Sequence, residues 1–337
     1  MGTGTDRQGG SLNGWERRKV LVTGAEGFIG STLVDRLTEL GADVRAFTHY
    51  KPYGDGGHLA GRENDVEIVT GDLRDPGRVY DAVDGCEVVF HLAALIGIPY
   101  SYEAPNSYVQ TNVIGTQHVA AASLRHAARL VHTSTSEVYG TARIVPIPET
   151  HPLQPQSPYS ASKIGADMMA LSYWHAFELP VAVVRPFNTY GPRQSARAVI
   201  PTILGQLHAG ARQIALGATT PTRDFNYVTD TVNGFIAAAD NDAVLGEAVN
   251  IGSGREISVG DLAELLIKIT GADAEVVTDR ERLRPSGSEV ERLLADTAKA
   301  RELLGYEPQV TLEEGLARTS EWVRDNLDRI GSRRYER

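Results

Sequence analysis

A tyrosine and a lysine stand four residues apart in Tyr159-Ser-Ala-Ser-Lys163. The pattern over 157–177 predicts a helix, so both side chains are expected on one face. An ammonium beside a phenol favours the phenolate, and we expect it to bring the pKa of Tyr159 down from about 10 toward neutrality. The pair therefore predicts a base that takes a proton from an alcohol while a hydride leaves the same carbon. Because this spacing also arises by chance on surface helices, its meaning depends on other motifs.

A second polar group, Ser134-Thr135-Ser136-Glu137, follows an apolar run that is typical of a buried strand. α/β folds place their sites at the carboxyl ends of such strands. We expect Thr135 to hydrogen-bond the reacting alcohol and Glu137 to act as an acid or base. Ser136 completes the predicted catalytic group. The alternative is a Ser/Thr-rich turn with a surface glutamate, but the nearby tyrosine and lysine argue against it.

Three glycines near the start, in Gly24-x-x-Gly27-x-x-Gly30, stand between an expected strand and an expected helix. Glycine permits the tight turn there and lets a pyrophosphate approach the positive N-terminus of the helix. This context predicts dinucleotide binding rather than a purely structural turn. Asp72 and Leu73, directly after the third strand, are expected at the adenine edge, although Asp72 would also suit a helix N-cap.

The end of the second strand leaves the choice of dinucleotide open. An acidic residue there would bind the ribose hydroxyls of NAD, whereas the chain has Thr48-His49-Tyr50-Lys51. His49 or Lys51 would equally suit the 2′-phosphate of NADP. We expect Thr48 and Lys51 to contact the cofactor.

Four arginines are predicted in loops rich in glycine and proline. Guanidinium groups suit a diphosphate, although any single one is also explained as a solvated surface arginine. Two histidines, His91 and His132, lie within apolar strands and are interpreted as packed core side chains or as neighbours of the cofactor, not as catalysts. The arginines are Arg193, Arg197, Arg223 and Arg284.

Composition narrows the class of protein. The chain has 337 residues and a formal net charge of −10, which disfavours general binding to nucleic acid or anionic membranes. Its single cysteine excludes an intrachain disulfide framework and a multi-cysteine zinc site. No metal site is expected. Residues 1–18 lack the apolar core of a secretory signal and predict a flexible arm, and no stretch is long enough to span a membrane. We expect a cytoplasmic protein.

The predicted catalytic and cofactor-binding residues must be positioned by secondary structure. Along the chain, short β-branched runs alternate with amphipathic stretches. The alternation predicts an α/β fold, a Rossmann-type doubly wound parallel sheet, with a smaller substrate-binding lobe. The dinucleotide-binding domain is expected over 19–185, with a return segment near 225–255, and the lobe over 186–224 and 256–337. Expected strands are 19–23, 44–48, 67–70, 87–92, 130–134 and 181–185, and expected helices are 28–40, 78–83, 109–125 and 157–177.

Together these motifs resemble the extended short-chain dehydrogenase/reductase family, in its NAD-dependent sugar-nucleotide epimerase/dehydratase branch. The resemblance extends from residue 19 to about 327. Besides the motifs above it rests on His91-Leu-Ala-Ala94, Asn112, Arg185-Pro-Phe-Asn-Thr-Tyr-Gly-Pro192, Arg223-Asp-Phe225 and Asn250-Ile-Gly-Ser-Gly254. It implies a tightly held NAD that is recycled in each turnover, a sugar nucleotide in the cleft and often a homodimer built on four helices.

The resemblance also implies roles for further residues. Asn188 and Arg223 would hold the diphosphate, and Tyr100, Ser101 and Tyr102 would line the hexose pocket. Further cofactor contacts are implied at Phe28, Ile29, Leu92, Ala93, Ala94, Asn112 and Pro186.

Within the branch, several stretches look most like nucleotide-linked N-acetylglucosamine 4,6-dehydratases, among them Leu95-Ile-Gly-Ile-Pro-Tyr-Ser-Tyr102 and Glu289-Val-Glu-Arg-Leu-Leu-Ala-Asp296. The resemblance thus implies a nucleotide-sugar 4,6-dehydratase acting on an N-acetylhexosamine or hexose. Many hexose 4,6-dehydratases carry Asp-Glu where this chain has Ser136-Glu137, so one carboxyl is missing. A 4-epimerase and a UDP-glucuronate decarboxylase stay open as alternatives, and a non-catalytic dinucleotide sensor is disfavoured by the intact catalytic group.

Overall fold

The computed structural model describes residues 12–50, 57–283 and 285–330. Its centre is a parallel sheet of seven strands in the order β10-β6-β5-β4-β1-β2-β3. The six predicted strands are confirmed to within two residues at each end, and β10 extends the sheet beyond β6. The strands are β1 Lys19–Thr23, β2 Asp43–Thr48, β3 Glu67–Thr70, β4 Val88–His91, β5 Arg129–Thr133, β6 Val181–Pro186 and β10 Ala248–Ile251.

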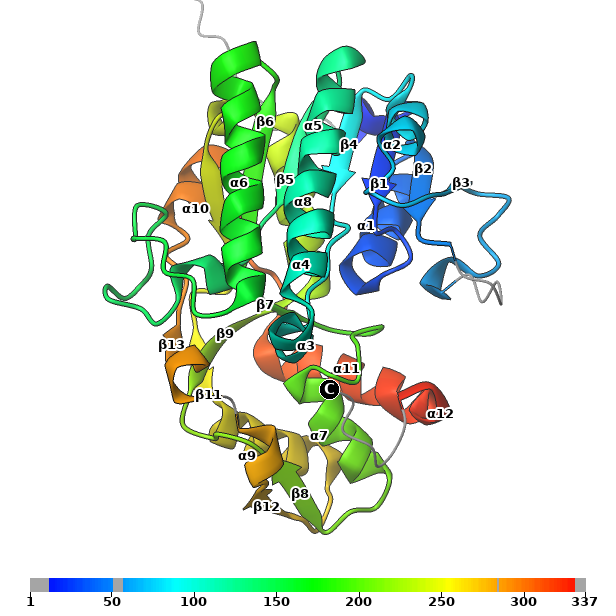
Figure 1. Cartoon of the computed structure of the whole chain (residues 1–337). Coiled ribbons are helices and arrows are strands. Elements are labelled where there is room, and N and C mark those ends of the chain that lie inside the picture. Colours follow the sequence, from blue (N-terminus) through cyan, green and yellow to red (C-terminus); the bar gives the residue numbers. More distant parts are fainter. Residues whose placement is uncertain (1–11, 51–56, 284, 331–337) are drawn as a thin grey trace, which may run out of the picture.

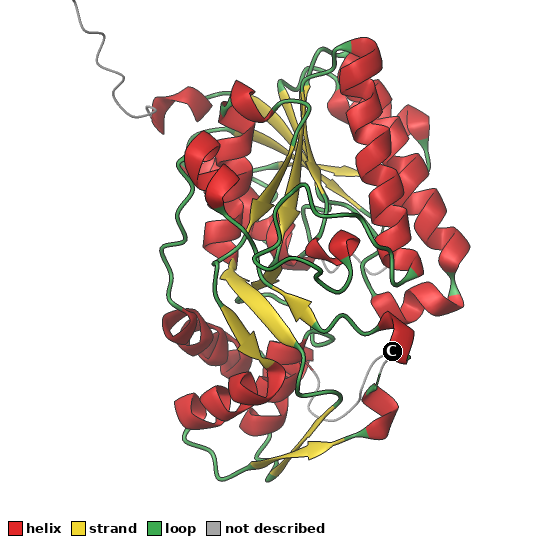
Figure 2. Ribbon diagram, turned by 90° about the vertical axis from the view of Figure 1, so that its left-hand side faces the viewer, coloured by secondary structure: helices red, strands yellow, loops and turns green. Residues whose placement is uncertain are grey.

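Helices cover both faces of this sheet, as the predicted doubly wound fold requires (Figure 2). In β1, Val20 and Val22 pack into the core on one face and Leu21 into the core on the other. A strand buried on both sides reads as a continuous apolar run, which explains its pattern. One face carries α1 Phe28–Glu39, α8 Val228–Asp240 and α10 Ala298–Leu304, and the other carries α2 Pro76–Val83, α5 Gly115–Arg125 and α6 Pro158–Phe177.

The chain reverses direction across the sheet between β1 and β4. From β1 it proceeds outward through β2 to β3, then returns to β4 on the other side of β1. Ligands of doubly wound proteins bind at the carboxyl ends of the strands at such a point. The turn after β1 and the segment after β4 therefore form the expected dinucleotide crevice.

The helix predicted over 109–125 has a more complex form. It begins earlier, as α4 Pro105–Tyr108, continues through a π-helical segment Val109–Ile114 and becomes α5. The π segment carries Asn112, whose side chain bonds the loop after β4. Periodicity alone cannot reveal one wide turn inside a helix, and such turns are often found at functional sites.

A smaller lobe lies beyond one end of the main sheet (Figure 1). Its strands are β7 Asn188–Tyr190, β9 Thr222–Tyr227, β11 Glu256–Ser258 and β13 Arg292–Leu293, with β8 Gln213–Leu216 paired to β12 Glu275–Thr278. The prediction that Arg223 lies in a loop is wrong, because this residue belongs to β9, which pairs with β7, β11 and β13. The lobe's helices are α7 Val199–His208, α9 Val259–Thr270, α11 Leu312–Asp325 and the short α12 Leu327–Ile330.

Two segments lie closer to the main sheet than predicted. Trp15 is only 2% exposed and donates from Nε1 to Asp240 Oδ2 at 2.8 Å, so residues 12–18 are not a free arm. Near the other end, Ala300 and Tyr306 pack into the same core as α1 and α8 rather than into the lobe. Over the described ranges, no helix is long and apolar enough to cross a membrane, and no cluster of His, Cys, Asp and Glu is arranged to hold a metal ion.

Candidate active site

Tyr159 and Lys163 lie in the first turns of α6, beside the end of β5. The helix starts at a serine cap, where Ser157 Oγ accepts from Ser160 N at 3.1 Å, and this fixes the direction of its first turn. Tyr159 is 7% exposed and Lys163 is 5% exposed. Lys163 Nζ donates to the carbonyl of Thr133 at 2.6 Å, and the Tyr159 phenol shares a hydrogen bond with the Thr135 side chain. The predicted pair is thus held against the predicted Thr135.

The electrostatics of this pair differ from the prediction. Burial raises the pKa of Tyr159, and the hydrogen bond from Thr135 only partly offsets it. Burial likewise lowers the pKa of Lys163 to about 8, against the opposing charge of Asp167. The Lys163 ammonium donates to a backbone carbonyl and not to the phenol. The effect of burial on the pKa of Tyr159 therefore exceeds any effect of the Lys163 charge. The protein alone therefore keeps Tyr159 protonated at neutral pH.

Glu137 follows Thr135 in a short 3-10 turn, Ser136–Tyr139. Thr135 Oγ1 accepts from Glu137 N at 3.2 Å, and Val138 and Tyr139 are fully buried in a neighbouring cluster. Glu137 is half-buried, and its charge is among the causes that raise the pKa of Tyr159. The carboxylate of Glu137 therefore lies near the phenol of Tyr159. Ser136 is buried.

The glycine turn after β1 leaves no room for side chains. A Cβ on Gly30 would stand 2.2 Å from the carbonyl oxygen of Gly24. Gly24 has φ +67°, and a Cβ there would meet the backbone of Ala93 at 2.9 Å. α1 starts at Phe28 without a side-chain cap, so no side chain of the N-cap residue accepts from its first N–H groups. This cradle at a helix N-terminus fits the pyrophosphate of a dinucleotide.

The segment after β4 is tied to that turn by Thr23. Its hydroxyl oxygen accepts from the backbone N–H groups of Leu92 and Ala93, each at 3.1 Å. Its proton is then free to point at His91 Nδ1, 2.9 Å away, while Nε2 of His91 lies 3.0 Å from Thr116 Oγ1. His91 is thereby held inside the fold, in line with its interpretation as a packed side chain.

The predicted adenine end is arranged around Asp72. Its hydrogen bonds with Arg74 lower the pKa of the carboxyl to about 2, and His49 Nε2 lies 3.5 Å from Oδ2. Asp72 is not the N-cap of α2, because Asp75 takes that place. Thr48 is buried at the end of β2. Leu73 is buried beside Gly115, and Lys51 lies outside the described residues.

Asn112 does not present its side chain to the crevice. Its amide accepts from Leu95 N at 2.8 Å and donates to Leu95 O at 3.0 Å and to Ser162 Oγ at 2.9 Å. All three bonds are internal, so Asn112 anchors the loop after β4 to α6. Pro186 is the buried last residue of β6.

The predicted hexose pocket is only partly open. Tyr100 and Tyr102 lie on α3 Ile98–Glu103 and are 44% and 38% exposed, while Ser101 is buried and bonds the carbonyl of Ile98 at 2.6 Å. The Tyr102 hydroxyl bonds Ser288 Oγ of the short turn Ser286–Ser288. Sequence reasoning missed Tyr108, whose ring stands edge-on to Tyr159 at 6.3 Å.

Three of the four predicted arginines lie in the described part of the chain, and each has different surroundings. Arg193 Nη1 pairs with Asp35 Oδ2 of α1 at 2.7 Å, which joins the lobe to the dinucleotide domain. Arg223 lies on β9, is 7% exposed and pairs with Glu289 Oε1 at 3.2 Å. Arg197 is exposed, and its charge reaches Tyr108. Arg284 lies outside the described residues.

Asn188 is the first residue of β7. Its Oδ1 atom is buried without a hydrogen-bond partner. Such a group is often completed by a ligand or water.

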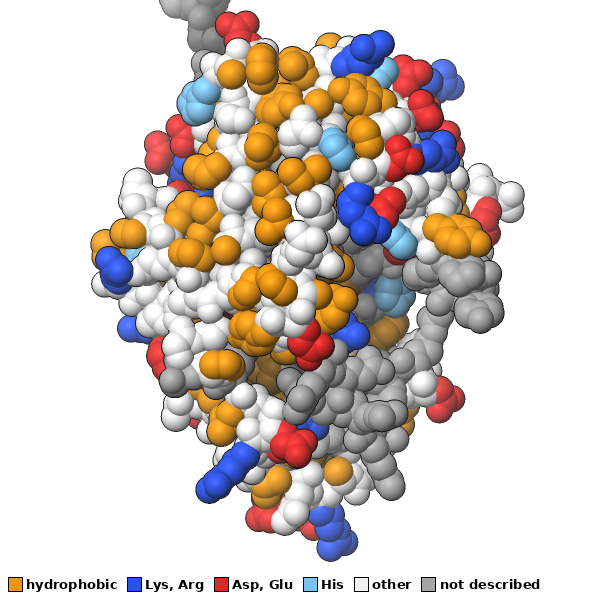
Figure 3. All heavy atoms as spheres, viewed as in Figure 1, with side chains coloured by type: hydrophobic (Ala, Val, Ile, Leu, Met, Phe, Trp, Pro, Cys, Tyr) orange, Lys and Arg blue, Asp and Glu red, His pale blue; other side chains and the backbone are white. Residues whose placement is uncertain are grey.

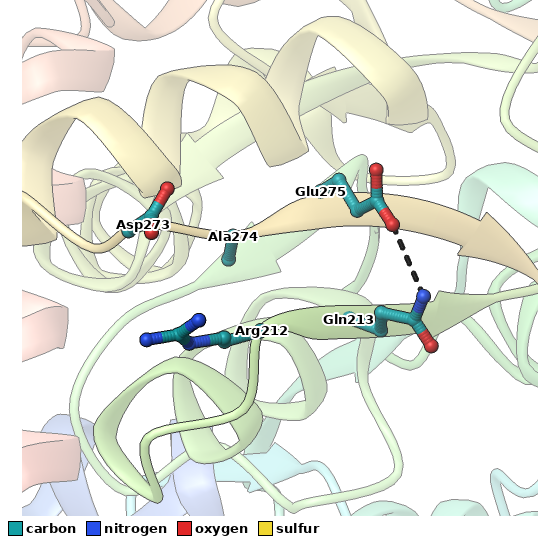
Figure 4. A pocket seen from close by; sticks show the side chains of 5 residues that line it. All are labelled: Arg212, Gln213, Asp273, Ala274 and Glu275. Carbon is teal, nitrogen blue, oxygen red and sulfur yellow. Dashed lines mark hydrogen bonds between the residues drawn. The ribbon is translucent and has the colours of Figure 1, made fainter.

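A separate hollow lies at the outer end of the lobe, between β8 and β12 (Figure 4). Its lining includes Arg212, Asp273 and Glu275, and Glu275 accepts from Gln213 Nε2 at 3.0 Å. None of the predicted site residues lines it, so it is not the candidate active site.

The parallel sheet, the glycine cradle and the Thr135, Tyr159 and Lys163 group define an extended short-chain dehydrogenase/reductase. The chain belongs, within that class, to the family described as GDP-mannose 4,6 dehydratase, whose model matches residues 21–319. The predicted family, fold and enzyme class are thus confirmed: this is an enzyme of the sugar-nucleotide epimerase/dehydratase branch.

The individual relatives are named for different reactions. The chain is 37% identical to a dTDP-glucose 4,6-dehydratase of Streptomyces antibioticus, over 91% of this chain and 92% of the relative. It is 35% identical to a UDP-glucose 4-epimerase of Mycolicibacterium smegmatis, over 91% and 99%. The crystal structure of a double mutant of the dTDP-glucose 4,6-dehydratase DesIV from Streptomyces venezuelae, with NAD bound, superposes with a TM-score of 0.83 at 32% identity, over 91% and 97%.

Proposed function

We propose that the protein catalyses NAD-dependent 4,6-dehydration of a nucleotide-activated hexose or N-acetylhexosamine. The observation that carries this proposal is the convergence of Thr135, Tyr159 and Lys163 with the half-buried carboxylate of Glu137 at one end of the sheet. A redox base and a second acid/base near it provide what oxidation at C4 and elimination across C5 and C6 require.

NAD, when bound, accepts a hydride from the sugar and later returns one. Gly24, Gly27 and Gly30 would hold its pyrophosphate, and Leu92 and Ala93 would border it because Thr23 fixes their backbone. Tyr159 is protonated in the protein alone, so its activation needs a further positive charge. Bound NAD in its oxidised form would supply such a charge and so lower the pKa of Tyr159.

The proton steps are assigned to this chain's side chains. Thr135 holds the C4 hydroxyl, and Tyr159 takes its proton while hydride leaves C4. The resulting ketone acidifies the C5 hydrogen, which Glu137 removes. Water then leaves from C6 with the proton that Glu137 removed. Hydride returns to C6 and a proton is added at C5, and release of the proton that Tyr159 took from the C4 hydroxyl balances this addition. Tyr159 and Lys163 therefore serve the redox step, whereas Glu137 serves the elimination.

A 4-epimerase is the second candidate, and the epimerase among the relatives favours keeping it. It would use the same tyrosine and lysine but no base at C5. Ser136, in the position where many hexose 4,6-dehydratases have an aspartate, leaves Glu137 as the acid/base beside Tyr159. A decarboxylase would require a hexuronate substrate.

The products distinguish these reactions. The purified protein is incubated with a panel of nucleotide sugars, and the products are weighed by mass spectrometry. Loss of water supports the dehydratase, an unchanged mass with altered stereochemistry supports the epimerase, and loss of carbon dioxide supports the decarboxylase. Glu137→Gln should retain NAD binding and C4 oxidation but lose elimination by about 10²- to 10⁴-fold. Full dehydratase activity in that variant would overturn the role of Glu137.

We further infer that two copies associate through α5 and α6. Figure 3 shows hydrophobic side chains gathered over the face that these helices form. Leu124, Met168 and Phe177 are 37%, 45% and 55% exposed there, and exposed apolar patches of this kind mark interaction surfaces. Light scattering should give twice the mass of 36.4 kDa. Met168→Glu with Phe177→Glu should give the monomer mass, and an unchanged mass would exclude this face.

A further inference from the structure

A buried ionic cluster lies directly behind the catalytic group, centred on Asp167 of α6. Asp167 is 0% exposed. Its Oδ2 atom accepts from Ser134 Oγ at 2.7 Å and from Arg185 Nη2 at 3.2 Å. Its Oδ1 atom lies 3.2 Å from His132 Nε2 without an aligned hydrogen bond. Elements β5, β6 and α6 thus meet at one carboxylate.

Basic groups dominate the surroundings of this carboxylate. Arg185 and, at neutral pH, Lys163 are positively charged, and both are almost fully buried. His132 and His91 are also buried, with ring centroids 5.5 Å apart, and burial lowers the pKa of each, so both are neutral. Asp167 is therefore the anion that balances two buried cations. Buried charges are retained only when they are paired.

Asp167 and the catalytic group are linked through two routes. Ser134, which bonds Asp167, directly precedes Thr135, so the carboxylate anchors the backbone that presents Thr135 to the site. Lys163 lies one helical turn before Asp167 on the same face of α6. The charge of Asp167 opposes the effect of burial on the pKa of Lys163.

We propose that Asp167 is a positioning residue for the proposed redox step: its buried carboxylate anchors the end of β5 through Ser134 and balances the charge of the Lys163 ammonium. It does not face the crevice and touches no reacting atom. This role rests on the proposed function, because it acts through Tyr159, Lys163 and Thr135. The charged and titratable groups around Lys163 are Asp167 and Tyr159 on α6, His132 on β5, His91 on β4 and Arg185 on β6.

The effect of the Asp167 charge on Lys163 can be measured by NMR without turnover. The chain has only five lysines, so the signal of Lys163 can be assigned. Labelling the lysine ε-carbons should give five NMR signals, and the spectrum of Lys163→Met identifies the one from Lys163. In the wild-type protein that signal should titrate near a pKa of about 8. In Asp167→Asn it should titrate about one pH unit or more lower, as expected for the loss of a nearby opposite charge.

A matched control removes a different buried carboxylate. Asp230 is 2% exposed on α8, on the other face of the sheet, and accepts from Val310 N at 3.0 Å. Asp230→Asn should leave the Lys163 titration unchanged. An equal shift in both variants, or no shift in Asp167→Asn, would overturn the electrostatic part of the proposal.

Kinetics test the same proposal in the working enzyme. The alkaline limb of the kcat profile should move to lower pH in Asp167→Asn, with KM for the nucleotide sugar unchanged. Ser134→Ala keeps the carboxylate and removes the anchor, so it should lower kcat without moving either the limb or the Lys163 titration. A wild-type kcat in Ser134→Ala would overturn the anchoring role. If Asp167→Asn does not fold, the kcat of Ser134→Ala serves as the test of the proposal.

The outcomes separate the two proposals. If the wild-type protein converts no nucleotide sugar, the proposed function fails while the NMR titration still reports on Asp167. If turnover occurs and the titrations of wild type and Asp167→Asn coincide, the proposed function stands and the role of Asp167 is refuted.

Discussion

Replacing Gly30 by alanine tests the cofactor cradle directly. A Cβ at this position would lie 2.2 Å from the carbonyl oxygen of Gly24, so the backbone must open by about 1 Å to reach an ordinary contact. Overpacking of this size costs about 1–3 kcal/mol. If the turn relaxes outward in the free protein and must return to bind, the same energy weakens NAD binding by about 5- to 150-fold.

The assay combines calorimetric titration of NAD into nucleotide-free protein with urea denaturation. Gly77→Ala is the matched control, since Gly77 lies on the exposed surface of α2 and a Cβ there would be 3.4 Å from Asp75 Oδ1, an ordinary contact. This variant should bind NAD like the wild type and gain about 0.5–1 kcal/mol of stability. A Gly30→Ala protein that loses stability but binds NAD normally would refute the placement of the pyrophosphate in this turn.

Three further predictions concern catalysis, the crevice and pH. Tyr159→Phe should lower kcat by about 10²- to 10⁴-fold with unchanged NAD affinity, and normal turnover would disprove its role as the base. Thr23→Val leaves the partly buried N–H groups of residues 92–93 without their acceptor, so the free energy of unfolding in urea should fall by about 2–4 kcal/mol; wild-type stability would contradict this. Burial lowers the pKa of His91 and His132 in the folded protein, so the unfolded chain binds more protons below pH about 6.5. Unfolding free energy should therefore decrease as pH falls from 7 to 5.5, by up to about 1.4 kcal/mol per pH unit for each histidine, and a pH-independent value over that window would be inconsistent with neutral buried rings.

The charge state of the predicted base was the main electrostatic error of sequence reasoning. The spacing of Tyr159 and Lys163 correctly places both on one helix face, because that geometry is local. The spacing gives no information about the carbonyl of Thr133, which lies 30 residues earlier in the chain and accepts a hydrogen bond from the Lys163 ammonium. The spacing also does not indicate that Tyr159 is buried, and burial raises the pKa of its phenol. Both effects arise only when β5 and α6 come together.

The substrate side shows the same limit. Four arginines in glycine- and proline-rich segments were each predicted as candidates to bind a diphosphate. The structure instead ties Arg193 to Asp35 across the domains and places Arg223 in β9 beside Glu289. Guanidinium groups pair with the carboxylates that tertiary packing brings near, and sequence distance carries no information about which these are.

The amino-acid sequence by itself determined the alternating elements, the glycine turn and the family. Those features follow from short-range rules: which side chains share a face, which residues permit a tight turn and which runs are buried on both sides. The tertiary structure alone decided that Asn112 bonds inward, that Tyr108 stands against Tyr159 and that Asp167 joins three elements behind the site. Hydrogen bonds and charges between residues far apart in the chain depend on the fold, because only the fold sets their separation and removes the water between them.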